Sequence, residues 1–257
     1  MKYWKEGNLK IGIKNEQEIQ LMREGGKILG HILQELKKMV APGVTPLDLD
    51  QKAADIMKAF KVKPSFLGYR GYPNFICANV NNVVVHGIPD QIPLKNGDII
   101  TIDCGVIHGG LHTDAAVTTA VGTIPSEVEK FLKTAERALQ KAIEAVKPGI
   151  RIRHLSGIIQ DIVEKNGYSV VRDLIGHGIG EKMHEDPPVP NFRDRDIGPM
   201  LQVAMTIAIE PIICMGSPRV KTLRDNWTIV SVDGSLATQV EHSVVVTAKG
   251  SEVLTKA

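Results

Sequence analysis

The stretch from residue 99 to residue 119, IITIDCGVIHGGLHTDAAVTT, contains two aspartates in apolar surroundings, Asp103 and Asp114. Its residues alternate with a period of two, which predicts two strands, and the glycines after His108 can supply the turn. A loop at residues 108–109 would pair Asp103 directly with Asp114, whereas a loop at 109–110 would shift the register by two and keep both aspartates on one face. Two carboxylates that lie so near each other repel and lose hydration, so they need a shared proton or a cation.

Two further acids and one histidine have the chemistry of metal ligands. The stretch GDIITID ends at Asp103 and AMTIAIE ends at Glu210, and each acid is followed by another on a later predicted strand, Asp114 or Glu241. His177, in the sequence GHGIG, adds a nitrogen ligand. Four carboxylates and one histidine suit two divalent ions bridged by a water molecule, whose lowered pKa makes it a nucleophile for hydrolysis. Oxygen-rich ligation argues against a closed structural zinc site and leaves manganese, iron, cobalt or zinc as alternatives.

The elements that must position these residues are helices and strands in mixed order. Apolar residues at helical spacing predict four helices, over residues 16–40, 46–60, 126–146 and 153–165. Extended segments are predicted at residues 75–86, 99–119, 169–173 and 205–209, and as a hairpin of residues 227–232 with 238–247 about Asp233-Gly234. Because strands and helices do not alternate strictly, an α+β fold is favoured over a doubly wound one.

Two helix starts carry capping signals. Thr45 can cap the second helix, with Pro46 at its first position and Asp48 three residues after the cap. Ser126 with Glu129 has the pattern of a capping box for the third helix.

The second half of the chain repeats the pattern of the first. VAPGVTPLDLDQKAADIMKAF, from residue 40, resembles VKPGIRIRHLSGIIQDIVEKN, from residue 146, and the strands that end in an acid follow at nearly the same distance. We therefore expect one catalytic domain over residues 1–257, an internal repeat of about 16–122 and 126–248, and a short N-terminal segment, 1–15, with no assigned function. Two similar halves facing each other would bring their acids together near a pseudo-twofold axis.

Composition excludes several other functional classes. The chain is 43% hydrophobic and 23% charged, as is ordinary for a globular protein. A net charge of +2 gives no footprint for nucleic acid or a membrane surface. The three cysteines form no CxxC pattern, and there is neither an apolar signal core nor a membrane-spanning stretch. The expected location is therefore the cytoplasm, with reduced thiols.

The candidate ligands and their neighbourhoods resemble the type I methionine aminopeptidases. The resemblance extends from about residue 16 to residue 254. It rests on Asp103 and Asp114 separated by ten residues, His177 in GHGIG, Glu210 in IAIEP, Glu241 in QVEHS, His86 in VVVHGIP and His184 in MHEDP. It implies the pita-bread fold, in which two pseudo-twofold duplicated halves form a central curved antiparallel sheet covered by two pairs of helices.

The resemblance also implies roles for the ligands. Asp103 and Glu241 would contact both metal ions, Asp114 would chelate one of them, and His177 and Glu210 would bind the other. Glu210 would also move the proton of the attacking water.

Further residues would then contact the substrate. By the resemblance, His184 would hydrogen-bond the scissile carbonyl and stabilise the oxyanion, and His86 would contact the scissile nitrogen or the new amine. Side chains that align with the family's methionine pocket are Tyr69, Tyr72, Cys77 and Trp227. Where the family commonly has phenylalanine before the second histidine, this chain has Met183, which can still fill the pocket wall.

The implied activity is removal of the initiator methionine from nascent proteins and peptides when the second residue is small. The expected partners are nascent N-termini, near the ribosome exit, with no nucleic-acid read-out, no membrane and a monomeric enzyme. A prolidase or aminopeptidase P is a rival, but such enzymes usually carry a large N-terminal domain, for which there is no room before residue 16. A type II enzyme would need a helical insertion between His184 and Trp227, and a non-enzymatic binding module would have lost its ligands.

Overall fold

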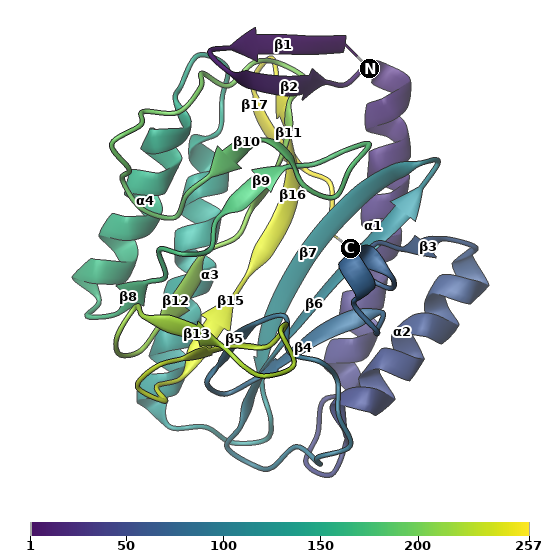
Figure 1. The fold of residues 1–257 in the computed structure, drawn as a ribbon, viewed down its shortest axis with the longest axis vertical. Helices are drawn as coiled ribbons and strands as arrows, with labels where there is room; N and C mark the ends of the chain where they lie inside the picture. The colour runs from purple at the N-terminus through teal and green to yellow at the C-terminus, as the bar shows by residue number, and fades with distance from the viewer. Residues whose placement is uncertain (1, 257) are drawn as a thin grey trace.

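An eleven-stranded sheet forms the centre of the computed structural model, which describes residues 2–256 (Figure 1). From one edge to the other its strands are β1 (Lys2–Glu6), β2 (Leu9–Ile13), β10 (Glu185–Val189), β9 (Gly176–Gly178), β11 (Thr206–Ile209), β16 (Glu241–Thr247), β7 (Leu111–Ala120), β6 (Ile99–His108) and β3 (Lys63–Pro64), with β17 (Gly250–Val253) on β16 and β4 (Ile76–Val80) on β6. Neighbouring strands are antiparallel except β2 and β10, which are parallel.

Two three-stranded sheets extend this arrangement at one end. One has the order β15 (Ala237–Gln239), β12 (Ile212–Cys214), β8 (Ser169–Val170), and the other has the order β13 (Val220–Thr222), β14 (Ile229–Ser231), β5 (Val83–Val85). A 3₁₀ turn, η1, covers Tyr69–Gly71. The two three-stranded sheets lie in the lower part of the view in Figure 1.

Two pairs of helices pack on the sheet. Helix α1 (Glu16–Met39) lies against β6 and β7, helix α2 (Pro46–Phe60) packs beside α1, β3 and β4, and helices α3 (Ser126–Ala145) and α4 (Ile152–Lys165) lie in the other half (Figure 1). Each pair has its own apolar core with the strands beneath it. Within residues 2–256, none of the helices is long and apolar enough to cross a membrane. The α+β architecture expected from the sequence is therefore present, with four helices close to their predicted bounds.

The two predicted helix caps have different outcomes. Thr45 caps α2: its side chain accepts the backbone N–H of Asp48, whose carboxylate accepts the N–H of Thr45. The capping box at Ser126 is wrong, because Ser126 is the first helical residue of α3. Pro125 stands at the cap with no side-chain hydrogen bond, and its carbonyl accepts the N–H of Glu129.

The predicted hairpin about Asp233-Gly234 is also wrong. Strand β14 pairs with β13 and β5, whereas β15 pairs with β12, so the two strands enter different sheets. The Asp233 carboxylate accepts the backbone N–H of Ser217 at 2.6 Å and that of Ser235 at 3.1 Å. Asp233 therefore holds the loop at Ser217 by a hydrogen bond and does not form the turn of a hairpin. The strand predicted at residues 169–173 is limited to β8.

A buried carboxylate on α2 holds the start of β4. Asp50 accepts three hydrogen bonds, from Asn74 Nδ2 at 2.9 Å and from the backbone N–H groups of Phe75 at 2.8 Å and Ile76 at 3.0 Å. Removing the carboxylate leaves three donors without this partner, among them the buried N–H of Ile76.

We expect Asp50→Ala to lower the free energy of unfolding by about 3 kcal/mol because of these unpaired donors. Urea denaturation measures the change. Asp55→Ala is the matched control, since Asp55 is exposed on the same helix. Equal effects of the two substitutions would contradict the prediction.

Candidate metal centre

The register of β6 and β7 places the two aspartates on one face of the sheet. Gly109 and Gly110 form the turn, with φ of +57° and +85°, and His108 pairs with Leu111. Asp103 is therefore opposite Ala116, and Asp114 is opposite Gly105. Of the two registers that the sequence allowed, this is the one shifted by two, and it sets the carboxylates diagonally, where side chains still reach each other.

The same row of residues continues across two more strands. Cys77 on β4 is opposite Asp103, and Glu241 on β16 is opposite Ala116. Since directly opposed residues share a face, these side chains project to the same side. The small Ala116 between Asp103 and Glu241 leaves space between the two carboxylates.

The second row brings in the histidine. His177 on β9 pairs with Ala208 on β11, and Ala208 pairs with Ser243 on β16. Glu210 follows Ala208 by two residues and Glu241 precedes Ser243 by two, so both acids share this face. The five candidate ligands thus converge from separate strands, with Ala or Ser between them.

The glycines beside His177 serve the packing of β9. A Cβ at Gly176 would collide with the carbonyl oxygen of Ala208, and one at Gly178 would collide with the carbonyl of Asp186. Strand β9 therefore fits between β10 and β11 only with glycine on both sides of its histidine. This close approach fixes where the imidazole projects.

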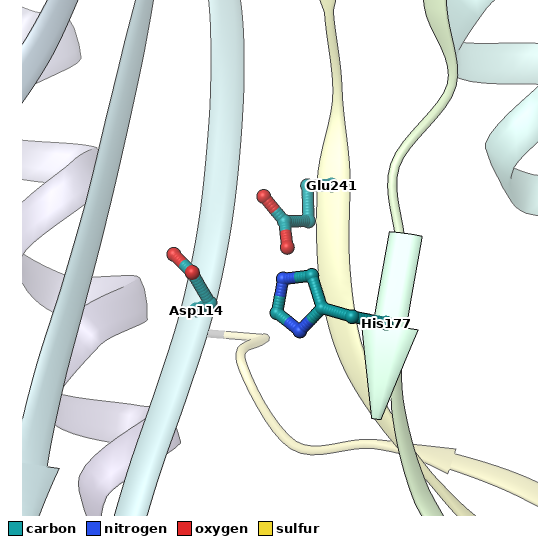
Figure 2. A group of neighbouring side chains, drawn as sticks. All are labelled: Asp114, His177 and Glu241. Atoms are coloured by element: carbon teal, nitrogen blue, oxygen red, sulfur yellow. The ribbon is translucent and has the colours of Figure 1, made fainter. Parts of the chain in front are cut away.

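The ligand-type atoms face one another across a short gap. Figure 2 shows the side chains of Asp114, His177 and Glu241, which offer ligand atoms that all lie within 4.8 Å of one another. His177 Nε2 is 3.7 Å from a carboxylate oxygen of Glu210. All these side chains are buried, and so is Asp103.

Burial makes the charges of this cluster costly without a cation. Desolvation raises the pKa of Asp103 to about 7 and raises the pKa of Glu210 well above its usual range. Burial likewise raises the pKa of Asp114 and Glu241 and lowers the pKa of His177 to about 4. A neutral imidazole nitrogen can bind a divalent cation, and such a cation would stabilise the ionised carboxylates.

Three carboxylate oxygens give an independent indication that these residues fit a cation. One oxygen each of Asp103, Asp114 and Glu241 is buried without a hydrogen-bond partner. Buried polar atoms are otherwise nearly always paired. The chemistry of this donor set, carboxylate oxygens with one imidazole nitrogen, fits divalent metal ions.

The other residues singled out from the sequence surround the same cavity, which has a volume of about 310 Å³. Alongside the five candidate ligands, it is lined by Tyr69, Tyr72, Cys77, His86, Met183, His184 and Trp227. Its apolar wall is one cluster, formed by Phe66, Tyr72, Cys77 and Met183, with Tyr69 and Trp227 packed against it. The candidate metal ligands thus line one part of the cavity, and an apolar pocket lies beside them.

Two further histidines face this cavity. His184 has its ring centroid 4.3 Å from that of His177, and its Nδ1 is 3.0 Å from the Tyr69 hydroxyl. His86 has a φ of +57°, a conformation that is rare outside glycine, and its ring lies against Trp227 with centroids 6.2 Å apart. Backbone strain of this kind is concentrated at functional sites.

Sequence reasoning missed two polar residues of the cavity, Gln239 and Arg70. Gln239 Nε2 lies 3.2 Å from Glu210 and 3.4 Å from both Asp103 and Glu241, so its amide donates toward three candidate ligands. The sequence signal for Gln239 was its position two residues before Glu241, which puts both side chains on the same face of an extended segment. Arg70 also lines the cavity and lies over the Tyr69 ring.

Comparison with known proteins gives consistent matches. The profile of metallopeptidase family M24 matches residues 20–248. A methionine aminopeptidase of Clostridium perfringens is 49% identical over 245 residues, which are 95% of this chain and 98% of the relative. The crystal structure of a methionine aminopeptidase from Thermotoga maritima superimposes with a TM-score of 0.94 at 42% identity, covering 96% of this chain and all of the other. A prolidase from Pyrococcus horikoshii, at 23% identity and a TM-score of 0.78, shares the fold over 95% of this chain and 63% of its own.

Proposed function

Because the chain belongs to metallopeptidase family M24 and is a metalloaminopeptidase of the methionine aminopeptidase type, we propose that it removes N-terminal methionine when the second residue is small. Its fold is the pita-bread fold of that family. The observation that carries the proposal is the single cavity in which five ligand-type side chains adjoin an apolar pocket. A methionine side chain fits such a pocket by shape and dispersion.

The family is metal-dependent, and we assign two divalent ions to this chain. Asp103 and Glu241 would contact both ions, Asp114 would hold one, and His177 with Glu210 would hold the other. When bound, divalent ions polarise a carbonyl and lower the pKa of water toward neutrality. The unpaired carboxylate oxygens support this assignment, and manganese, iron, cobalt and zinc all suit the ligands.

The chain's own side chains would handle the proton and the oxyanion. A Glu210 carboxylate oxygen would take the proton of the attacking water and pass it to the leaving amine nitrogen. The Tyr69 hydroxyl can donate to His184 Nδ1, which leaves the proton on Nε2, where it would donate to the developing oxyanion. His86 would contact the scissile nitrogen or the new amine.

The apolar wall would set the choice of substrate. Tyr72 is held by its hydroxyl, which lies 3.0 Å from the carbonyl oxygens of both Ile76 and Gly87 and shares its one proton between them. Its ring meets that of Trp227 edge to face, with centroids 5.1 Å apart. Cys77 and Met183 would complete the wall against the methionine thioether. We propose nascent chains near the ribosome exit as the natural substrates, and a cytoplasmic monomer as the active form.

We expect hydrolysis of Met-Ala-Ser to disappear after chelation and to return when a suitable divalent ion is added back. Without the ions, the buried carboxylates hold protons and no activated water is present. Activity is measured by release of methionine, with manganese, cobalt, iron and zinc tested separately. Calorimetric titration should find two ions per chain.

Substrate comparison separates the proposal from its rivals. Met-Ala-Ser should be cleaved much faster than Met-Leu-Ser, and an Xaa-Pro dipeptide should not be cleaved. Preference for the Xaa-Pro substrate would indicate a prolidase, and full activity after complete chelation would exclude a metal-dependent mechanism.

A further inference from the structure

The N-terminal hairpin is fastened to the segment that carries His184. Strands β1 and β2 pair with each other, and Ile11 of β2 pairs with Asp186 of β10. The backbone N–H of Lys10 donates to the Asp186 carboxylate at 2.8 Å. The Tyr3 hydroxyl donates to Glu181 at 3.0 Å. The hairpin therefore contacts the chain on both sides of residues 182–185.

Lys14, the residue after β2, makes the central contact. Only 3% of Lys14 is exposed, and its Nζ is 2.9 Å from one carboxylate oxygen of Glu185. The other oxygen of Glu185 accepts the backbone N–H of Lys182 at 2.9 Å. One carboxylate thus ties the N-terminal segment to both ends of the turn that holds His184.

The ammonium group also lies against the turn between the two histidines. A Cβ at Gly180 would come within 2.6 Å of Lys14 Nζ. Gly180 is fixed in turn, since its carbonyl accepts the N–H of His112 at 2.8 Å and its N–H donates to the carbonyl of Lys182 at 3.1 Å. Any shift of this turn moves His184 relative to His177.

Stability alone is a poor reason for this arrangement. Removing an ammonium and a carboxylate from water is unfavourable, and apolar pairs of similar volume often stabilise a fold as well. A buried pair does, however, fix one geometry, because each partner is left uncompensated when the other moves. Here that geometry is the conformation of the turn from Gly180 to Glu185.

We propose that Lys14, acting through Glu185, is a positioning residue that holds the His184 imidazole in place for the reaction. The proposal rests on the proposed function, since it assigns His184 to the oxyanion. Lys14 itself contacts neither the candidate ligands nor the apolar pocket. Its effect reaches the reaction only through the turn.

The test is a double-mutant cycle between Lys14 and His184. We expect Lys14→Met to lower kcat for Met-Ala-Ser about 10- to 100-fold, because small misplacements of a catalytic group have effects of this size. KM and the affinity for manganese, measured by calorimetry, should change less than threefold. In a His184→Ala background, Lys14→Met should cause no further loss of kcat.

Controls keep a loss of fold apart from a loss of positioning. Lys5→Met changes an exposed lysine of the same hairpin and should leave kcat unchanged. If Lys14→Met does not fold, the double variant Lys14→Met/Glu185→Met, in which no charge stays buried, carries the test. Its thermal unfolding should remain cooperative while kcat stays low.

Two results would overturn the proposal. One is full kcat in a folded Lys14→Met or double variant, and the other is an equal loss of kcat in the presence and absence of the His184 imidazole. Either result would leave methionine release by the unmodified chain intact. If the unmodified chain with metal released no methionine, the proposed function itself would fail instead.

Discussion

Glu210→Gln lowers the turnover of Met-Ala-Ser by about 10³-fold or more, since removal of general acid–base catalysis has effects of this order. The amide keeps the shape of the side chain, and its oxygen can still accept the hydrogen bond from Gln239, whose Nε2 lies 3.2 Å from a Glu210 oxygen. It cannot take a proton from water or return one to the leaving amine. It is also a weaker ligand, so the affinity for metal falls together with turnover.

Two measurements separate these contributions of Glu210. Calorimetric titration with manganese gives the affinity, and kcat is then determined at saturating metal, where only the loss of proton transfer remains. Glu144→Gln, an exposed change on α3, is the control and should alter neither quantity. Near-normal kcat of Glu210→Gln at saturating metal would remove Glu210 from the proton pathway.

The sequence predicted the candidate ligands because each has a local signature. Asp103 and Asp114 flank a glycine turn, and His177 lies between glycines that the packing of β9 requires. Period-two alternation identified the strands, and helical spacing identified four helices almost to the residue. The internal repeat of residues 16–122 and 126–248 remains a prediction, although each half contributes one helix pair joined through a Pro-Gly turn.

What sequence reasoning could not reach depends on contacts between distant segments. The register of β6 and β7 had two solutions, and both glycines in the left-handed region select one. The residues about Asp233 have the chemistry of a hairpin turn, yet the carboxylate binds the backbone of Ser217 instead. Lys14 gave no signal at all, because its partner Glu185 is far along the chain. Local sequence patterns therefore predict local backbone geometry, whereas contacts between residues far apart in the sequence are known only from the folded structure.

The second large effect is expected at His184, where the role depends on one tautomer. The Tyr69 hydroxyl is 3.0 Å from Nδ1 and can donate a hydrogen bond to it, which places the imidazole proton on Nε2. That proton is what a developing oxyanion requires. We expect His184→Ala to reduce kcat about 10²- to 10³-fold, or roughly 2.7–4 kcal/mol of transition-state stabilisation, as for other lost oxyanion donors.

Steady-state kinetics and a second substitution test this role of His184. The loss should fall on kcat, with KM and manganese affinity little changed, because the interaction strengthens only as charge develops. Tyr69→Phe removes the donor to Nδ1 and should reproduce part of the loss, but it should have no further effect on kcat once His184 is alanine. An effect of His184→Ala confined to KM would assign the imidazole to ground-state binding, since an oxyanion donor must act on the chemical step.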